Sequence, residues 1–268
     1  MSRPERLQKA LARVAREQGM DLERLRRWVS FLALCGALDR ALHEGRLEAY
    51  HLKGGVALEL RFAELARATK DLDLGLRGAR TRRLPALADA LAGGFDQFTF
   101  RLKAPARDMD QVDTVRVSVA IQYRSRSWQT IEVDLGPASV RRVDVIEPRV
   151  RGLETVGIPV PAGVRCLSLA DQVAQKLHAC TGPSSAGRAR DVLDILLIDQ
   201  LGQLDYEEVA ATAQQVFAER ATHAFPPLFN MPEEWEPELE SLSTELGFST
   251  TTAAEIERRF AAFVERLA

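Results

Sequence analysis

Residues 53–75, which read KGGVALELRFAELARATKDLDLG, place a glycine turn and a pair of acids at the two ends of a short helical stretch. Asp71 and Asp73 alternate with leucines, so a strand would carry both carboxylates on one face. Carboxylates this close repel each other unless a cation lies between them. Mg²⁺ prefers oxygen ligands, and two such ions about 3.5 to 4 Å apart assist displacement at phosphorus. The pair therefore predicts a metal site for phosphoryl chemistry, with a solvated strand end as the alternative.

The glycine turn predicts an anion site at the other end of this stretch. Gly54 and Gly55 can adopt backbone angles closed to other residues and expose their N–H groups. A helix that begins at Val56 adds free N–H groups and the positive end of its dipole. Phosphates at the glycines and metals at the acids would belong to one nucleoside triphosphate if the helix folds back to the same ligand. The further predicted phosphate contacts are Lys53, Arg67, Thr69 and Lys70.

A third carboxylate is expected in a two-metal site. Asp134, in the segment TIEVDLG, alternates with apolar residues and so lies on the polar face of a predicted strand, together with Glu132. If this strand lies beside the strand of Asp71, Asp134 completes the metal cage, with Glu132 as the second choice. The alternative is a polar-face residue with no metal role.

Predicted strands carry these acids into one sheet. Apolar and polar residues alternate in residues 71–74, 98–102, 115–121 and 131–135. Each segment has one apolar and one polar face, which favours a mixed or antiparallel sheet with helices packed on the apolar side.

Helical periodicity flanks the sheet on both sides. Apolar residues recur at three- and four-residue steps through the N-terminal region, with Gly19 and Asp21 between two predicted helices. Helical patterns return after Pro159, and the four prolines of residues 225–237 predict an irregular connection before a final helix.

We therefore predict an α+β, two-lobed fold. It has N-terminal helices over residues 1–45, a mixed-sheet core over residues 46–158 and a helical C-terminal lobe over residues 159–268.

The composition excludes several classes of protein. A net charge of −2, from 36 Lys and Arg against 38 Asp and Glu, is not that of a polycation that coats nucleic acid. The three cysteines form no C-x-x-C pair, which argues against zinc and favours a reducing, cytoplasmic setting. Apolar runs are shorter than the roughly 20 residues of a spanning helix, so we expect no membrane. Arginine groups that are candidate phosphate contacts, or else ordinary surface cations, are Arg77, Arg80, Arg82, Arg83, Arg124, Arg126, Arg141, Arg142, Arg149 and Arg151.

A second charged region lies in the segments LADQVAQKLHAC and RARDVLDI. Lys176 falls outside the apolar stripe of its predicted helix, which suits a solvated lysine as well as a ligand contact. Asp194 interrupts an apolar run, so it would be partly buried and need a partner. Arg190, four residues earlier, is placed to pair with it. A structural ion pair explains this pattern as well as catalysis does.

The order Lys-Gly-Gly-x-Ala-Leu, then Arg-x-Thr-x-Asp-Leu-Asp-Leu, resembles the first motif of the AbiEii/AbiGii toxin nucleotidyltransferases. This family is a branch of the DNA polymerase β-like nucleotidyltransferase superfamily. The segments around Lys176 and Asp194 resemble its second conserved region, and the similarity extends over about residues 45–268. The matching catalytic positions are Lys176, Asp191 and Asp194, with Arg188 or Arg190 ahead of the acids on the nucleotide side.

The resemblance implies an enzyme that binds a nucleoside triphosphate (NTP) and Mg²⁺ and transfers a nucleotide to an acceptor without a template. Members of the family are toxins of type IV toxin–antitoxin or phage-defence systems. Some modify the 3′ acceptor end of tRNA and so block translation. NTP, tRNA and a cognate antitoxin are therefore the expected partners. Two alternatives stay open: a nucleotidyltransferase that acts on a small molecule such as an antibiotic, and a non-catalytic nucleotide-binding module.

Overall fold

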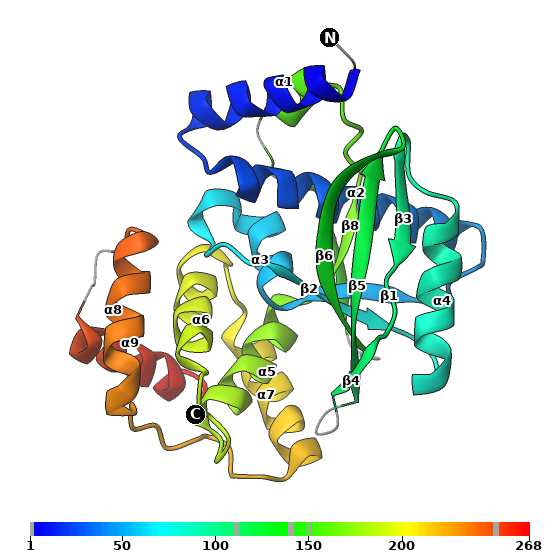
Figure 1. Cartoon of the computed structure of the whole chain (residues 1–268). Helices are drawn as coiled ribbons and strands as arrows, with labels where there is room; N and C mark the ends of the chain where they lie inside the picture. Colours follow the sequence, from blue (N-terminus) through cyan, green and yellow to red (C-terminus); the bar gives the residue numbers. More distant parts are fainter. Residues whose placement is uncertain (1–2, 110–112, 139–141, 149, 151, 249–251) are drawn as a thin grey trace. The chain divides into compact units, whose positions relative to one another are not determined.

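In the computed structural model of the chain, residues 3–109, 113–138, 142–148, 150, 152–248 and 252–268 are described. The chain divides into two compact units (Figure 1). The sheet unit comprises Met1–Glu64 with Ala68–Leu167, and the helical unit comprises Leu65–Arg67 with Ser168–Ala268. The predicted domain boundaries near residues 45 and 158 stay predictions. The two compact units separate after Leu167.

One mixed sheet forms the centre of the sheet unit (Figure 1). Its strands run in the order β3-β5-β6-β2-β1-β8-β7, and β4 pairs with β5. β2 is parallel to β6 and β1 is parallel to β8, whereas the other pairs are antiparallel. The mixed sheet expected from the alternating segments is thereby confirmed. The strands are β1 (Tyr50–Lys53), β2 (Asp71–Leu76), β3 (Phe98–Leu102), β4 (Arg107–Met109), β5 (Thr114–Tyr123), β6 (Arg126–Pro137), β7 (Val143–Ile146) and β8 (Val164–Leu167).

Helices cover the apolar face of this sheet. α2 (Leu22–His43) packs on β6 and β8, and α4 (Arg80–Ala92) packs on β3, β6 and α2. Leu72 and Leu74 of β2 are buried in the same core as Trp28 and Phe31 of α2. The residues that alternate with these leucines therefore point to the opposite face of the sheet. The other helical segments of this part of the chain are α1 (Arg3–Gln18), α3 (Gly54–Phe62), η1 (Ala63–Leu65) and η2 (Leu153–Val156).

The break between α1 and α2 follows its sequence signals. Gly19 adopts a left-handed φ of 64°, which a residue with a side chain tolerates poorly. The side chain of Asp21 accepts a hydrogen bond of 2.7 Å from the backbone nitrogen of Arg24 and so caps α2.

The helical unit is built from packed helices. α5 contacts α6 and α7, and α6 contacts α8 and α9. Ser168 caps α5 and Asp205 caps α7 through their side-chain oxygens. The helical lobe expected from the periodicity is present as α5 (Leu169–Thr181), α6 (Ala189–Leu201), α7 (Tyr206–Arg220), α8 (Glu236–Glu245) and α9 (Ala253–Glu265), with the short η3 (Glu233–Trp235). Among the described helices, none has the length and apolar character needed to cross a bilayer.

Three elements differ from the sequence expectations. Residues after Pro159 were expected to be helical, but β8 extends the sheet there, because a four-residue strand is too short to show an alternating pattern. α4 was not expected, since its first turns are rich in arginine and contain Pro85. α8 begins where the Pro-rich segment ends and was not expected. Pro237 stands in its first turn, where a proline costs no helical hydrogen bond.

Candidate functional site

The two predicted acidic strands are neighbours in the sheet. β2 and β6 pair in parallel, with Asp73 opposite Asp134 and Asp71 opposite Glu132. The expectation that the strand of Asp134 lies beside the strand of Asp71 is therefore confirmed. All four carboxylates belong to the face opposite the apolar core.

Two cations flank this acidic pair of strands. Lys53 of β1 lies opposite Asp73, and Arg116 of β5 lies opposite Asp134. One row across four strands thus reads Lys53, Asp73, Asp134, Arg116. We call Lys53, Asp71, Asp73, Arg116, Glu132 and Asp134 the charged patch. A second row of the sheet contains Asp71, Glu132 and Ser118. The Ser118 hydroxyl donates to Oε1 of Glu132 at 2.6 Å.

Arg116 is the member of the charged patch that sequence reasoning missed. Its Nε and Nη2 donate to Oδ1 and Oδ2 of Asp134, both at 2.6 Å, and Nη2 lies 3.6 Å from Oδ2 of Asp71. The hydrogen bonds to Asp134, followed by the negative charge of the neighbouring carboxylates, raise the pKa of Arg116 above its ordinary value despite partial burial. Apolar and polar residues alternate along β5, which places Arg116 on the polar face of a strand. This alternation does not indicate which strand pairs with β5.

The glycine turn lies against one of the acids. Gly54 has φ 63°, and a Cβ atom added there would overlap the carboxylate of Asp73, whose Cγ would be only 2.9 Å away. Gly55 is buried at the start of α3. Because β1 and β2 are antiparallel with α3 between them, the chain folds back as expected, and the turn and the acids are adjacent.

A second residue missed by the sequence analysis, His51, lies on the same face as Lys53, two residues earlier in β1. It is buried over Gly75, where an added Cβ would come within 2.7 Å of its Nε2. Burial, followed by the charge of Lys53, lowers the pKa of His51 to about 4. The imidazole is therefore neutral at physiological pH and adds no charge to the patch.

The acids of β2 fit a magnesium ion that is shared with a substrate. Among the described residues, no three His, Cys, Asp or Glu side chains are placed to hold a metal. Of the expected ligands Asp71, Asp73 and Asp134, Asp134 accepts hydrogen bonds from Arg116 at both of its oxygens. Mg²⁺ is commonly held by one or two carboxylates together with substrate phosphates. Asp71 and Asp73 meet that requirement, and the metal role of Asp134 stays a prediction.

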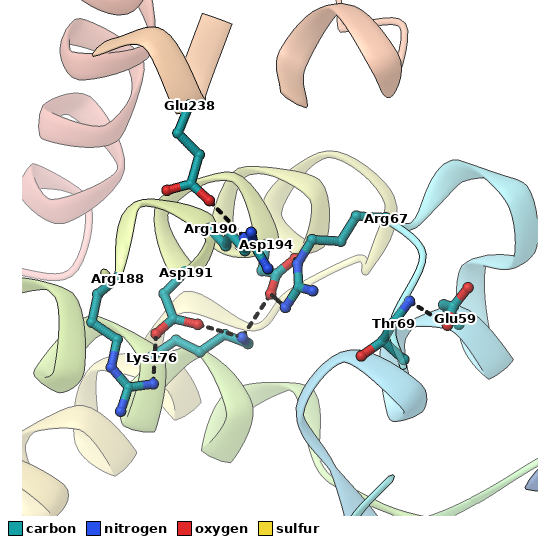
Figure 2. A network of polar contacts seen from close by, with 9 residues as sticks. All are labelled: Glu59, Arg67, Thr69, Lys176, Arg188, Arg190, Asp191, Asp194 and Glu238. Carbon is teal, nitrogen blue, oxygen red and sulfur yellow. Dashed lines mark hydrogen bonds and ion pairs between the residues drawn. The ribbon is translucent and has the colours of Figure 1, made fainter. Parts of the chain in front are cut away.

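The second predicted region forms a buried ionic cluster in the helical unit. Figure 2 shows the Lys176 side chain of α5 reaching Asp191 and Asp194 of α6. Its Nζ donates to Oδ1 of Asp191 at 2.6 Å and to Oδ2 of Asp194 at 2.7 Å. Only 11% of the Lys176 side chain is exposed. The solvated lysine considered from the sequence is therefore wrong.

Arg67 completes this cluster, since the helical unit includes Leu65–Arg67. Its Nε and Nη2 donate to Oδ1 and Oδ2 of Asp194 at 3.1 and 3.0 Å (Figure 2). Arg188 lies 3.5 Å from Asp191. Arg67 and Asp194 are 127 positions apart in the sequence. No local sequence pattern could identify this bidentate pair.

The predicted pairing of Arg190 with Asp194 is wrong. Nε of Arg190 donates to Oε1 of Glu238 of α8 at 2.7 Å, and the Arg190 side chain is 57% exposed (Figure 2). Asp194 faces the interior of the unit, with 2% of its side chain exposed. A spacing of four residues places two side chains on neighbouring positions of a helix. Here Arg190 pairs with Glu238 instead, and Asp194 pairs with Lys176 and Arg67.

The cluster fixes the ionisation of its members. Burial would lower the pKa of Lys176, but the charges of Asp194 and Asp191 outweigh it and raise that pKa above its ordinary value. Burial opposes ionisation of Asp194, yet Lys176 and Arg67 hold its pKa below the usual range. Lys176 is therefore a permanent cation at physiological pH and cannot serve as a general base in this arrangement.

A buried glutamate anchors the segment that leads into β2. Oε2 of Glu59 accepts from the backbone nitrogen of Thr69 at 3.0 Å (Figure 2), and Oε1 accepts from Nε of Arg24 at 2.8 Å and Nε1 of Trp28 at 3.0 Å. Burial raises the pKa of Glu59, and Arg24 opposes that rise. Because only Lys70 separates Thr69 from Asp71, this network restrains the start of the acidic strand.

Several candidate arginine contacts have partners within the sheet unit. Arg83 is buried and donates to both oxygens of Asp113, at 2.8 and 2.7 Å. Arg77 pairs with Glu48 at 3.1 Å. Arg83 therefore has a structural role and Arg77 belongs to an exposed ion pair, whereas Arg141, Arg149 and Arg151 lie outside the described residues.

Comparisons with known proteins show the family and the fold of the chain. The family described as nucleotidyl transferase AbiEii toxin, type IV TA system, matches residues 36–267. The solved structure of MenT4, a nucleotidyltransferase toxin from Mycobacterium tuberculosis H37Rv, is similar with a TM-score of 0.62 at 15% identity, over 100% of this chain and 89% of that one. The solution structure of the antibiotic-resistance factor ANT(2″)-Ia aligns with a TM-score of only 0.40 at 17% identity, over 72% of this chain and 94% of that one. No curated protein matches the sequence significantly.

Proposed function

The chain belongs to the AbiEii nucleotidyltransferase toxins of type IV toxin–antitoxin systems, and from this premise we propose that it transfers nucleotides from an NTP to the 3′ end of tRNA. The reaction joins an acceptor hydroxyl oxygen to the α-phosphorus and releases pyrophosphate. The observation that carries the proposal is the adjacency of the Gly54 turn to Asp73, which puts an anion-binding backbone next to a pair of metal-binding acids.

Asp71 and Asp73 are the proposed magnesium ligands. When bound, Mg²⁺ supplies positive charge for the phosphates and lowers the pKa of the acceptor hydroxyl. Gly54 and Gly55 present backbone N–H groups to phosphate oxygens, and Lys53 adds a cation in the same row of the sheet. Thr69 contributes a hydroxyl from a segment whose backbone Glu59 restrains.

The ionic cluster of the helical unit is proposed to bind phosphate groups. Lys176 and Arg67 are cations that lose little side-chain entropy on binding a phosphate, because Asp191 and Asp194 already hold them in place. Asp191 and Asp194 act here as positioning residues. Arg190 would have to leave Glu238 in order to contact a nucleotide.

The toxin family supports the biological setting. We infer that modified tRNA acceptor ends stop translation in the cytoplasm, that a cognate antitoxin restrains the protein, and that phage defence is one use of this arrest. Arginines of the sheet unit such as Arg124 and Arg126, at a hairpin between β5 and β6, are the proposed RNA phosphate contacts.

Incubation of the protein with total tRNA, Mg²⁺ and each labelled NTP in turn tests this function. We expect label at tRNA 3′ ends, located by mass spectrometry, and loss of at least about 100-fold on Asp71→Asn, since even residues behind a metal ligand contribute 10- to 100-fold. Label that enters no RNA, or that enters only an added aminoglycoside, contradicts the tRNA assignment.

A further inference from the structure

Backbone pairing places an arginine opposite Asp134, the carboxylate expected to be the third metal ligand. Arg116 and Asp134 are direct partners in the antiparallel pair of β5 and β6, and Asp134 and Asp73 are direct partners in the parallel pair of β6 and β2. Directly opposite residues have Cβ atoms about 4.5 to 5.5 Å apart. The proximity of Arg116 to Asp134 thus follows from strand register as well as from side-chain conformation.

The guanidinium bridges two carboxylates as a shared metal ion would. Nη2 of Arg116 lies 2.6 Å from Oδ2 of Asp134 and 3.6 Å from Oδ2 of Asp71. The second hydrogen bond, from Nε at 2.6 Å, leaves each oxygen of Asp134 with a charged donor. Asp134 is 15% exposed and Arg116 35% exposed, so water screens this bidentate pair less than a surface ion pair.

The charge of the patch matches a single divalent cation. Its four carboxylates and two cations leave a formal charge of −2. One Mg²⁺ neutralises that charge, whereas a second would leave the patch positive before a nucleotide is counted. Removal of Arg116 lowers the charge to −3 and frees Asp134, which creates the ligand set of a two-metal site.

We propose that Arg116 takes the place of a second metal ion, so that this protein works with one Mg²⁺, held by Asp71 and Asp73, and uses Asp134 to hold Arg116. The inference rests on the proposed magnesium-dependent transfer. Arg116 is then a fixed positive charge beside Asp71 that requires no metal loading, and Asp134 is a positioning residue rather than a ligand.

Equilibrium dialysis with Mn²⁺ and a non-hydrolysable NTP analogue tests the stoichiometry. We expect one bound Mn²⁺ per bound nucleotide for the unmodified chain and two for Arg116→Gln. Asp134→Asn should keep one Mn²⁺ with affinity changed less than about threefold, because Asp134 is not a ligand. The double variant Arg116→Gln/Asp134→Asn should return to one, since the second ion needs the Asp134 carboxylate. Circular dichroism checks that each variant is folded.

Two control variants test whether a positive charge at position 116 is what excludes the second ion. Lys103→Gln removes a cation that donates to Thr130 on the same face at 3.0 Å and should bind one Mn²⁺, as should Arg116→Lys, which retains the charge. Two Mn²⁺ on the unmodified chain, one on folded Arg116→Gln, or tenfold weaker Mn²⁺ binding by Asp134→Asn overturns the inference. Nucleotide transfer to tRNA in any of these cases leaves the proposed function standing, whereas absence of any bound Mn²⁺ contradicts both.

Discussion

A side chain at position 54 would collide with the carboxylate of Asp73, so Gly54 controls how closely an acid approaches the backbone of the turn. Its φ of 63° adds an independent requirement, because the left-handed region costs a residue with a Cβ about 1 to 2 kcal/mol. At the residue scale the site therefore depends on the missing side chain of Gly54 as much as on its charged groups.

Gly54→Ala is expected to abolish nucleotide binding as well as to destabilise the fold. Gly45→Ala is the matched control, because Gly45 has φ 72° but no atom within 4 Å of an added Cβ. The left-handed φ should cost each variant about 1 to 2 kcal/mol of unfolding free energy, and the overlap with Asp73 should make the loss larger for Gly54→Ala, as measured by urea denaturation. Only Gly54→Ala should also lose retention of labelled NTP, and equal binding by the two variants would contradict the steric argument.

The two acids of α6 are expected to contribute unequally. Asp194→Ala removes the buried carboxylate that Lys176 and Arg67 share, which costs about 3 to 5 kcal/mol. Asp191→Ala leaves Lys176 paired with Asp194 and should cost less than half of that, because Asp191 is also the more exposed acid. Chemical denaturation of the two variants side by side checks the order, and the reverse order would show that Arg67 does not depend on Asp194.

At the scale of elements, Glu59 connects α2, α3 and the segment before β2. Glu59→Ala removes the acceptor of Arg24, Trp28 and Thr69 at a buried position, so we expect a loss of about 3 to 5 kcal/mol. Exposed Glu64, five residues later, provides the control, and Glu64→Ala should change stability by less than about 0.5 kcal/mol. At temperatures where Glu59→Ala is folded, its KM for NTP should rise through the loosened Thr69 segment; an unchanged KM would limit Glu59 to a structural role.

The contact of α5 with α7 predicts a dependence of stability on pH. Nδ1 of His178 lies 3.2 Å from Nη1 of Arg220, and its Nε2 lies 2.8 Å from the Thr222 hydroxyl. Burial, followed by the charges of Arg220 and His223, lowers the pKa of His178 to about 4. The unfolded chain, with an ordinary histidine pKa of about 6.5, therefore binds more protons between about pH 6.5 and 4. Stability should fall as the pH falls through that range.

Thermal unfolding at pH 7.5 and 5.0 measures this effect. His178→Gln should make the decrease in melting temperature from pH 7.5 to 5.0 smaller, because the titrating imidazole is removed. His43→Gln, at a histidine whose side chain is 70% exposed, should leave the loss unchanged. Equal pH dependence in all three proteins would show that the loss comes from other groups.

At the scale of the whole molecule, nucleotide binding is linked to the stability of the folded chain. A ligand that binds only the folded chain at 100 times its dissociation constant adds about 2.7 kcal/mol of stability. We therefore expect NTP with Mg²⁺ to raise the melting temperature, and the double variant Asp71→Asn/Asp73→Asn to lose the part that depends on Mg²⁺. A shift that is the same with and without Mg²⁺ would contradict the assignment of these acids.

Local sequence was sufficient to predict the glycine turn and the face of the acids in the sheet unit, but not Arg116. Alternation with leucines placed Asp71 and Asp73 on one face, and the glycine pair marked the turn before α3, because strand periodicity and backbone freedom are properties of neighbouring residues. The helices of the C-terminal part followed from the same kind of local signal, whereas β8 and α8 did not.

Only the tertiary structure decided which charges meet. Arg116 pairs with Asp134, and Arg67 with Asp194, across separations of 18 and 127 residues. Strand register and helix packing set these contacts, and neither is encoded in the spacing of the residues themselves. The sequence by itself determined which face of their strands Asp71, Asp73 and Asp134 occupy. The fold decided that Asp134 has an arginine partner and that Arg190 lies outside the Asp194 cluster, because the partner of a buried charge is chosen by the elements that enclose it.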